Sequence, residues 1–469
     1  MYIKSVKISN YRIFQNTFEL TSDHIGVPDG TTAGSGLTVL VGENGVGKTS
    51  ILDAIALSLI SYRSDGLVLA DFNNIQNSVE VAITAEAPFT VKKTIRGNFN
   101  ASGFKFVGKL RSQNSVRFLV DTVVTDVFFV PDEGENITAG SPDLRTAVDN
   151  PFAGPRFSDN DYIFIDKNRI KVLEPGTYAA TRFDRVLEDL NFQYLQINNP
   201  PLGVNAAIEK LISHEAINSA LNSAFEDFEG LTGYRVRINL ISDALPYKKA
   251  FLGYEDMGNN QIPVEKMGSG YQMLLALICQ QHLSMQSGRR LIVLIDEVEL
   301  HLHPKIQKQL VDLLLELSKT AQIILTSHSP ELLKDLQKNQ NRKINAIIRD
   351  GDALAINPLE RFVLPVPTIS ETNYVAFNLA SMEYFIQLYN QIGEANNVSS
   401  VAAIDSLLRD ASTQLINWQR DDGTTQQLTK YSCIRNKFHH PSNHRNDSLF
   451  ACDYEAVAEA ITFLRTKLA

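Results

Sequence analysis

The segment GENGVGKT, residues 42–49, places glycines, a lysine and a threonine at the spacing G-x-x-x-x-G-K-[ST]. The apolar run LTVLV precedes it, and TSILDAIALSLI, with helical spacing, follows it. Glycines let a main chain wrap around phosphate oxygens, while N–H groups and a helix N-terminus supply positive charge. In such a loop the lysine reaches the terminal phosphates and the threonine hydroxyl binds Mg²⁺. We predict that the phosphates of a nucleotide are bound by Gly42, Glu43, Asn44, Gly45, Val46, Gly47, Lys48, Thr49 and Ser50.

Two acidic residues end a later apolar strand, LIVLIDE, residues 291–297. Together with Thr49, Asp296 would hold the Mg²⁺ ion, and Glu297 would orient or deprotonate the attacking water. Taken alone, acids at a strand end are as often ordinary polar residues, so the pair gains its meaning from the phosphate-binding loop.

Two more segments carry residues that suit a phosphate site. ILTSHSP ends another apolar strand and places His328 where it would contact a γ-phosphate, because nucleotides bind outside the carboxyl ends of parallel strands. KMGSGYQ, residues 266–272, opens a helix with two glycines and a serine, which suits a second phosphate contact. A bland loop histidine and a plain N-cap at Ser269 are the simpler alternatives.

The segment KYSCIRNKFHHPSNHRND, residues 430–447, contains a third candidate site in Arg435, Asn436 and His440. Residues i and i+5 stand about 140° apart on an ideal helix, so arginine and histidine converge only if the helix ends near the histidine. On RNA, histidine can take the 2′-hydroxyl proton or protonate the leaving oxygen, and arginine can clamp the phosphate without a metal. Asparagine could orient the histidine or bind phosphate. The alternative is a solvated helix end, where cations are favoured anyway.

Bulk properties bound the class of protein. The 469 residues are 44% hydrophobic, and the formal net charge is -9. This composition predicts two or three globular domains and gives no global basic field for nucleic acid. Three cysteines without a CxxC pair favour a reducing compartment. The longest apolar runs are too short to span a bilayer, so we expect a cytoplasmic protein with no membrane contact.

Strands and helices alternate from about residue 37 to 355, which predicts an α/β fold with a parallel sheet. We predict an ATPase domain over residues 1–364, with a helical insertion at about 170–260. An all-helical domain is predicted over residues 365–469. Its expected helices are Tyr374–Ile392, Ser399–Gln419, Gln426–His439 and Tyr454–Leu468.

The motifs ISNYRIF, VLVGENGVGKTSILDAI, MGSGYQ, LIDEVELHLHP and ILTSHSPELL occur in this order, and the order resembles the SMC/RecF-like branch of ABC-type ATPases. The resemblance implies a P-loop head in which Lys48 and Thr49 are the Walker A pair. Asp296 then corresponds to the Walker B acid, Glu297 to the catalytic base and His328 to the switch histidine. It further implies nucleotide contacts for Arg12, Ser269, Gly270 and Gln272, although Met267-Gly268 stands where the usual signature begins Leu-Ser.

Heads of this branch sandwich two ATP·Mg²⁺ molecules between them, so the resemblance implies a homodimer or higher homo-oligomer. The tail resembles the HEPN domain, an all-helical unit that usually acts as a metal-independent ribonuclease with the signature R-x(4–6)-H. Arg435, Asn436 and His440 match that signature, which implies an RNA substrate and paired tails. An inactive HEPN-like module and an unrelated helical tail are the alternatives.

Three functions follow from these motifs. The first is an ATPase that controls a HEPN-type ribonuclease, in antiphage defence or toxin-like growth arrest. The second is an ATPase sensor or scaffold whose separate partner, another defence protein, is the effector. The third is a RecF-like DNA-repair ATPase that holds DNA across its heads, for which a local basic groove would suffice.

Overall fold

The structure is a computed structural model. It describes residues 2–59, 67, 69–93, 97–110, 125–131, 160–166, 215–240, 250–255, 261–286, 288–300, 302–339, 341–350, 353–359, 362–410, 415–420, 422–447 and 452–468. The chain divides into two compact units, Met1–Pro358 and Leu359–Ala469. The sequence-based division placed the same boundary after residue 364. No described helix is long and apolar enough to cross a membrane.

A six-stranded sheet forms the centre of the first unit, and its strand order is β14-β13-β3-β12-β11-β7. All neighbours are parallel except β13 and β14, which pair antiparallel. The central strands are continuous apolar runs, as expected for strands covered on both faces. The strands are β3 (Leu37–Val41), β7 (Asn160–Ile165), β11 (Arg290–Ile295), β12 (Ala321–Thr326), β13 (Lys343–Asp350) and β14 (Ala353–Pro358).

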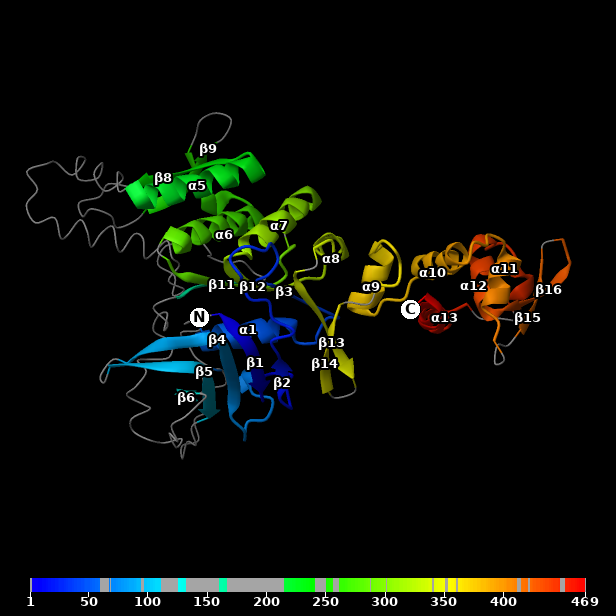
Figure 1. The fold of residues 1–469 in the computed structure, drawn as a ribbon, viewed down its shortest axis with the longest axis horizontal. Helices are drawn as coiled ribbons and strands as arrows, with labels where there is room; N and C mark the ends of the chain where they lie inside the picture. The colour runs from blue at the N-terminus through cyan, green and yellow to red at the C-terminus, as the bar shows by residue number, and fades with distance from the viewer. Residues whose placement is uncertain are drawn as a thin grey trace, which may run out of the picture. The chain divides into compact units, whose positions relative to one another are not determined.

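Helix α1 (Lys48–Leu59) lies between this sheet and a five-stranded sheet with the order β2-β1-β4-β5-β6, as Figure 1 shows. Apolar residues of both sheets and of α1 form one core, and nearly every residue of the helix is buried. This explains why α1 has apolar residues on all sides. The second sheet contains β1 (Ile3–Ser9), β2 (Phe18–Leu20), β4 (Val79–Lys93), β5 (Gly97–Leu110) and β6 (Thr125–Pro131).

The side chain of Gln322 on β12 joins the two sheets. Its Oε1 accepts a hydrogen bond from the Ile3 N–H at 2.7 Å, and its Nε2 donates to the Ile3 carbonyl at 2.7 Å. The same amide also donates to the carbonyl of Gly26 at 2.9 Å. Both N–H groups and the oxygen of the buried carboxamide therefore have hydrogen-bond partners. The pair of bonds to Ile3 resembles the pairing between two strand backbones.

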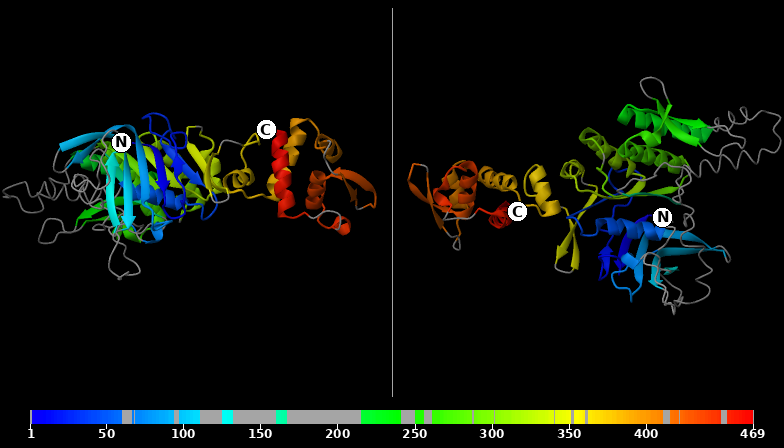
Figure 2. Two further views of the ribbon diagram at one scale, coloured as in Figure 1. Left: turned by 90° about the horizontal axis from the view of Figure 1, so that it is seen from below. Right: turned by 180° about the vertical axis from the view of Figure 1, so that it is seen from behind.

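The opposite face of the parallel sheet carries helices α6 and α7, which both figures place away from α1 (Figures 1 and 2). Helix α6 contacts β11, and α5 contacts both α6 and α7. The helices are α5 (Glu215–Thr232), α6 (Ser269–Gln286), α7 (Pro304–Leu317) and α8 (Pro330–Leu336), and the 3₁₀ turns of this unit are Leu69–Asp71 and Val264–Lys266.

The predicted helical insertion at 170–260 is only partly correct. Residues 215–232 form α5, but β8 (Arg235–Leu240), β9 (Ala250–Glu255) and β10 (Gln261–Pro263) form a three-stranded antiparallel sheet. The sequence RVRINL alternates and contains β-branched residues, which favours a strand. Its pairing with β9 stabilises this strand directly after helix α5. The rest of the predicted insertion lies outside the described residues.

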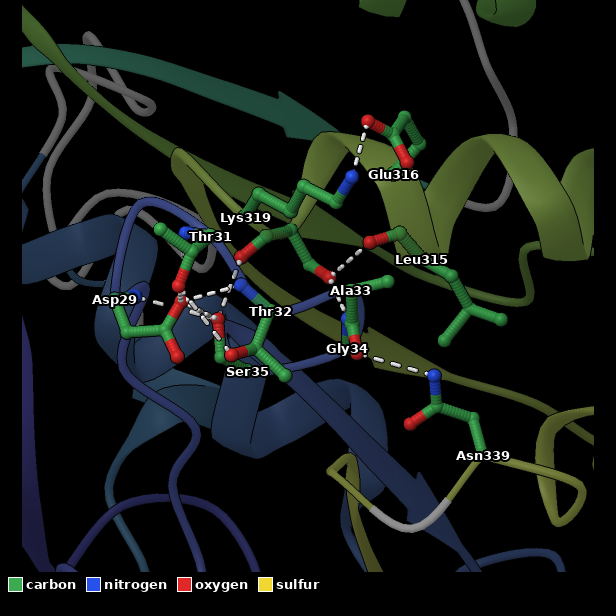
Figure 3. A network of polar contacts seen from close by, with 11 residues as sticks. Asp29, Thr31, Thr32, Ala33, Gly34, Ser35, Leu315, Glu316, Lys319 and Asn339 are labelled. Carbon is green, nitrogen blue, oxygen red and sulfur yellow. Dashed lines mark hydrogen bonds and ion pairs between the residues drawn. The ribbon is translucent and has the colours of Figure 1, made fainter.

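The loop over residues 26–36 leads into β3 and is fixed against the end of α7 (Figure 3). The Asp29 carboxylate accepts from the N–H groups of Thr31 at 2.8 Å and Thr32 at 2.7 Å. The Gly34 N–H donates to the carbonyl of Leu315 at 3.0 Å. These bonds satisfy the loop backbone and set where β3 begins.

The second unit has five helices among its described residues, and Tyr384, Phe385, Leu388 and Ile461 lie in its core. Helix α10 packs along α13. The rings of Tyr431 and Phe463 stack with centroids 4.3 Å apart. The helices are α9 (Ile369–Phe377), α10 (Met382–Ala395), α11 (Val401–Leu407), α12 (Lys430–His439) and α13 (Tyr454–Leu468), and a 3₁₀ turn covers His444–Asn446.

The prediction that this unit is all-helical is wrong. Strands β15 (Leu415–Gln419) and β16 (Thr425–Thr429) form an antiparallel hairpin where the predicted helices Ser399–Gln419 and Gln426–His439 would continue. Trp418 and Leu428 of the hairpin are buried against Cys433 of α12. The turn contains Gly423 at φ +85°, a conformation that glycine adopts readily.

The predicted helix Tyr374–Ile392 is two helices, α9 and α10. Asn378 ends α9 in the left-handed conformation, with φ +54° and ψ +31°. Ser381 then caps α10, because its side chain accepts from the Tyr384 N–H at 3.2 Å. An asparagine C-cap followed by a serine N-cap stops one helix and starts the next.

The Glu371 carboxylate is completely buried in the second unit. Its Oε1 accepts from the N–H groups of Val363 at 2.7 Å and Leu364 at 3.3 Å, and from the Tyr384 hydroxyl at 3.1 Å. The Arg465 guanidinium lies 3.6 Å from the same oxygen and donates to Tyr384. Burial raises the pKa of Glu371. One carboxylate thus ties the segment before α9 to α9, α10 and α13.

We expect Glu371→Ala to lower the free energy of unfolding of the second unit by about 3 kcal/mol, because it leaves the Arg465 charge and two backbone N–H groups without their acceptor. Trp418, the chain's one tryptophan, is buried in this unit, so its fluorescence during urea unfolding reports the transition. Glu394→Ala on an exposed position of α10 is the control. A loss below about 1 kcal/mol, the range of an exposed ion pair, would contradict this role.

Candidate nucleotide-binding site

The loop between β3 and α1 has the backbone that the glycine spacing predicts. Gly42, Gly45 and Gly47 have φ values of +139°, +81° and +89°. A Cβ atom on Gly42 would lie 2.4 Å from the Ile347 carbonyl oxygen, and one on Gly47 would lie 2.4 Å from Ile13 Cδ1. Glycine is therefore required at both ends of the loop, by backbone conformation and by space.

The Lys48 ammonium group lies inside this loop. Its Nζ donates to the carbonyls of Gly42 at 2.9 Å and Glu43 at 2.8 Å, and the residue is only 5% exposed. Burial lowers the pKa of Lys48 to about 8, against the opposing charges of Asp296, Glu297 and Glu299. The ammonium is thus poorly solvated, and it gains from exchanging two neutral carbonyls for phosphate oxygens.

The buried Asp296 carboxylate connects three elements of the site. The Thr49 hydroxyl, at the start of α1, donates to its Oδ1 and Oδ2 at 3.2 and 3.0 Å. The Thr326 hydroxyl, at the end of β12, donates to Oδ1 at 2.6 Å. The two predicted Mg²⁺ residues, Thr49 and Asp296, are therefore adjacent, and both present the hard oxygen atoms that Mg²⁺ prefers.

A Mg²⁺ ion would need further ligands at this place. The described residues contain no group of three or more His, Cys, Asp or Glu side chains that could hold a metal ion. Mg²⁺ commonly binds through one or two protein oxygens together with water and substrate phosphates. The Thr49–Asp296 pair suits that mode, in which the ion neutralises charge on the phosphates.

Glu297 and His328 lie in the same neighbourhood. The Thr326 hydroxyl accepts from the Glu297 N–H at 2.7 Å, and Glu297 has the unusual φ of +47°. Such backbone strain is often stored at functional sites. Burial and the Lys48 charge lower the pKa of His328, while Glu299, Glu297 and Asp296 oppose the shift. The structure therefore gathers the predicted lysine, carboxylates and histidine around one point.

Thr326 and Glu299 were not predicted from the sequence. Thr326 stands at the end of a buried strand, where threonine is ordinary. Glu299 follows Asp296 by three residues in VELHLHP, and its Oε1 accepts from the His328 N–H at 2.5 Å. The only sequence signal for Glu299 is that it is a third acid close behind Asp296 and Glu297 at the end of a strand.

Arg12 is bound to two carboxylates. Its Nε donates to Asp71 at 3.0 Å, its Nη1 donates to Asp53 on α1, and its guanidinium lies 5.0 Å from the Tyr11 ring centroid. These contacts hold Arg12 against α1, and the predicted nucleotide contact of this residue stays a prediction.

The predicted second phosphate-contacting segment begins α6 at Ser269. Gln272 donates through its Nε2 to the Met267 carbonyl at 2.8 Å, which closes the turn before the helix, and Gly270 is buried. Contact between this helix start and the nucleotide of a partner chain stays a prediction.

In the second unit, α12 ends at His439 and His440 follows as its C-cap. Arg435 donates through Nη1 to Asn436 Oδ1 at 3.2 Å, and the His440 N–H donates to the Asn436 carbonyl at 2.8 Å. Burial, followed by the charges of Arg435 and His440, lowers the pKa of His439. At this helix end Arg435 and Asn436 are half-buried and His440 is exposed, and the convergence of the three side chains stays a prediction.

Residues 37–334 match the protein family described as "AAA domain, putative AbiEii toxin, Type IV TA system". The chain belongs to this family of AAA ATPases. The matched residues contain the phosphate-binding loop, the Asp296 carboxylate and His328. Membership of this family supports ATPase activity and implies that the protein uses ATP.

The AAA ATPase is similar to three known proteins. It is 23% identical to the OLD nuclease of Thermus scotoductus, over 86% of this chain and 76% of that protein. It is 22% identical to the Retron Ec83 probable ATPase of Escherichia coli, over 63% and 64% of the two chains. It is also 22% identical to the DNA replication and repair protein RecF of Rickettsia africae, over 70% and 95%. An SMC head bound to the C-winged helix domain of ScpA gives a TM-score of 0.47 at 16% identity, over 76% of this chain and 97% of that chain.

We expect the affinity for ATP to fall as pH rises through the Lys48 pKa of about 8, because the neutral amine no longer attracts phosphate oxygens. In Mg²⁺-free buffer, titration calorimetry should show binding about fivefold weaker at about pH 9 than at about pH 8. Lys48→Arg stays charged over this range and should show no such slope. A parallel loss of affinity in both proteins would exclude Lys48 as the titrating group.

Thr326→Val should lower the kcat of ATP hydrolysis about tenfold and raise the Mg²⁺ concentration required, because Asp296 and the Glu297 N–H each lose a hydrogen-bond partner. Thr326→Ser keeps the hydroxyl and should stay within about threefold of wild type. Steady-state turnover across a Mg²⁺ titration checks both variants. Wild-type kinetics for the valine variant would show that the hydroxyl does not hold the site.

Proposed function

We propose that this ATPase controls a metal-independent RNA-cleaving site made of Arg435, Asn436 and His440, and that it acts in antiphage defence or toxin-like growth arrest. The observation that carries the proposal is the end of α12. The helix stops at His439 and His440 is its C-cap, with φ −127° and ψ +63°, while Arg435 stays on the helix and contacts Asn436. From this C-cap position, cleavage requires the His440 imidazole to turn toward Arg435, because residues i and i+5 of an unbroken helix lie on different faces.

These residues suit cleavage of RNA by its own 2′-hydroxyl. The 2′-oxygen attacks phosphorus as its proton passes to a base, and the bond to the 5′-oxygen breaks as that oxygen takes a proton. His440 is the acid or base, since imidazole titrates near neutral pH. Arg435 binds the phosphate and stabilises its developing charge, and Asn436 orients the guanidinium to which it is bonded.

A single histidine supplies one of the two proton transfers, so a second copy of the site would supply the other. We propose that two ATPase heads pair in the ABC-type manner around ATP and Mg²⁺ and so form a homodimer. In this dimer, the nucleotide of each chain faces Ser269, Gly270 and Gln272 of the other. Glu297 then activates the attacking water and His328 contacts the γ-phosphate. ATP turnover would change the arrangement of the paired units and so permit or prevent cleavage.

The similarity to an OLD nuclease and a retron ATPase supports a role in defence. The retron relative is named for its ATPase alone. This favours one alternative, in which the chain is a sensor or scaffold and a separate defence protein is the effector. The similarity to RecF favours another, a DNA-repair ATPase that binds DNA.

We expect Arg435→Ala and His440→Ala each to lower RNA cleavage by about 100-fold or more, since each removes a group that acts in the transition state. Total RNA from cells expressing each variant, and purified protein with labelled RNA and ATP, in Mg²⁺ buffer and separately in EDTA buffer, give the measurement. His444→Ala changes an exposed histidine four residues away and should cleave like wild type.

Lys48→Ala and Glu297→Gln separate ATP binding from ATP turnover in the same assay. Intact RNA with the wild-type protein in the apo, ATP-bound and ADP-bound states, and in phage-infected cells, would exclude the ribonuclease. A DNA-stimulated ATPase rate in that case would support the RecF-like alternative.

A further inference from the structure

Glu299 lies in the turn that connects the Asp296–Glu297 pair to α7. Its Oε1 accepts from the backbone N–H of His328 at 2.5 Å, across 29 residues of sequence. Its Oε2 is buried and has no hydrogen-bond partner among the residues that the structure describes. A carboxylate is costly to bury with an unused oxygen, so its place in the fold calls for a role beyond stability.

Gln307 on α7 joins the same two segments at a second place. Its Nε2 donates to the carbonyls of Leu302 at 3.1 Å and Glu299 at 3.4 Å. Its Oε1 accepts from the hydroxyl of Ser329 at 3.5 Å, and Ser329 is the N-cap of α8. Two side chains thus connect the turn after the two acids to the loop that carries His328. One is Glu299 in the turn itself, and the other is Gln307 on α7.

The Glu299 charge acts on the groups predicted to do the chemistry. Lys48 and His328 both experience its negative potential, which opposes the effect of burial on the pKa of each. The carboxylate therefore lies close to both, although its hydrogen bond goes only to the His328 backbone. A group so placed orients the histidine without itself having to touch ATP.

We infer that Glu299 is a positioning residue for ATP hydrolysis: its carboxylate fixes the backbone of His328 so that the imidazole faces the γ-phosphate, and Gln307 holds the turn that carries Glu299. The inference rests on the proposed γ-phosphate contact of His328. The hydrogen bond to a charged acceptor restricts the loop after β12, whose conformation sets where the imidazole points. For this positioning, the Glu299 oxygen that accepts from the His328 N–H matters more than the negative charge of the carboxylate.

The first test compares Glu299→Ala, which removes the acceptor, with Glu299→Gln, which keeps an oxygen for the His328 N–H. We expect the alanine variant to lower the kcat of ATP hydrolysis about tenfold while KM stays within about threefold, and the glutamine variant to recover most of the loss. Glu316→Ala removes an exposed carboxylate from α7 and is the matched control. An unchanged kcat for Glu299→Ala, or equal losses for both Glu299 variants, would overturn the inference.

The second test does not depend on activity. In protein labelled with ¹⁵N-histidine, the amide proton of His328, assigned with His328→Gln, should resonate downfield because of its short bond to a carboxylate. This resonance should move upfield in Glu299→Ala and much less in Glu316→Ala. An unmoved resonance would show that the bond does not form and would overturn the inference.

The two readouts distinguish failure of the inference from failure of the proposed histidine role. If His328→Gln hydrolyses ATP like wild type while the resonance shifts as expected, the hydrogen bond exists but His328 does not contact the γ-phosphate. If His328→Gln is impaired and Glu299→Ala is not, the histidine role holds and positioning by Glu299 is excluded.

Discussion

The hydrogen bonds of the Asp296 carboxylate hold the ATPase unit together at its functional end. Hydroxyl groups from α1 and β12 converge on this one side chain at the end of β11. They can do so only because β3, β12 and β11 are adjacent parallel strands in the correct register. A slip of one residue in β12 would turn Thr326 to the other face of the sheet and remove the contact. The register of the sheet and the geometry of the predicted Mg²⁺ site are therefore one constraint.

The same convergence explains which parts of the site the sequence could predict. Gly42, Lys48 and Thr49 belong to a local pattern, since the loop and its helix lie within a few residues of each other. Asp296 and His328 end apolar strands, and parallel strands bring their carboxyl ends to one edge. Thr326 and Glu299 matter only through neighbours that are distant in sequence. Threonine in a strand and glutamate in a turn are too common for a single sequence to mark them.

The incorrect predictions for the second unit missed the β15–β16 hairpin and the break between α9 and α10. Strands β15 and β16 are short, and an isolated hairpin of this size is marginal. Burial of Trp418 and Leu428 against Cys433 stabilises it, and that tertiary contact outweighs the local preference. The break between α9 and α10 did have a local signal, the asparagine and serine in FNLASM, but such residues also occur inside helices. In contrast, α13 has the predicted bounds, because its apolar spacing is regular and unbroken.

The place of β3 in the sheet has a consequence for synthesis of the protein. This central strand pairs with β12 and β13, which follow it by nearly three hundred residues. Gln322 likewise completes the contacts of β1 at the very start of the chain. During translation β3 therefore stays unpaired and apolar until β12 has left the ribosome. The nascent chain therefore exposes an aggregation-prone apolar segment, LTVLV, for much of its synthesis. A chaperone that binds this segment during that interval would raise the yield of folded ATPase.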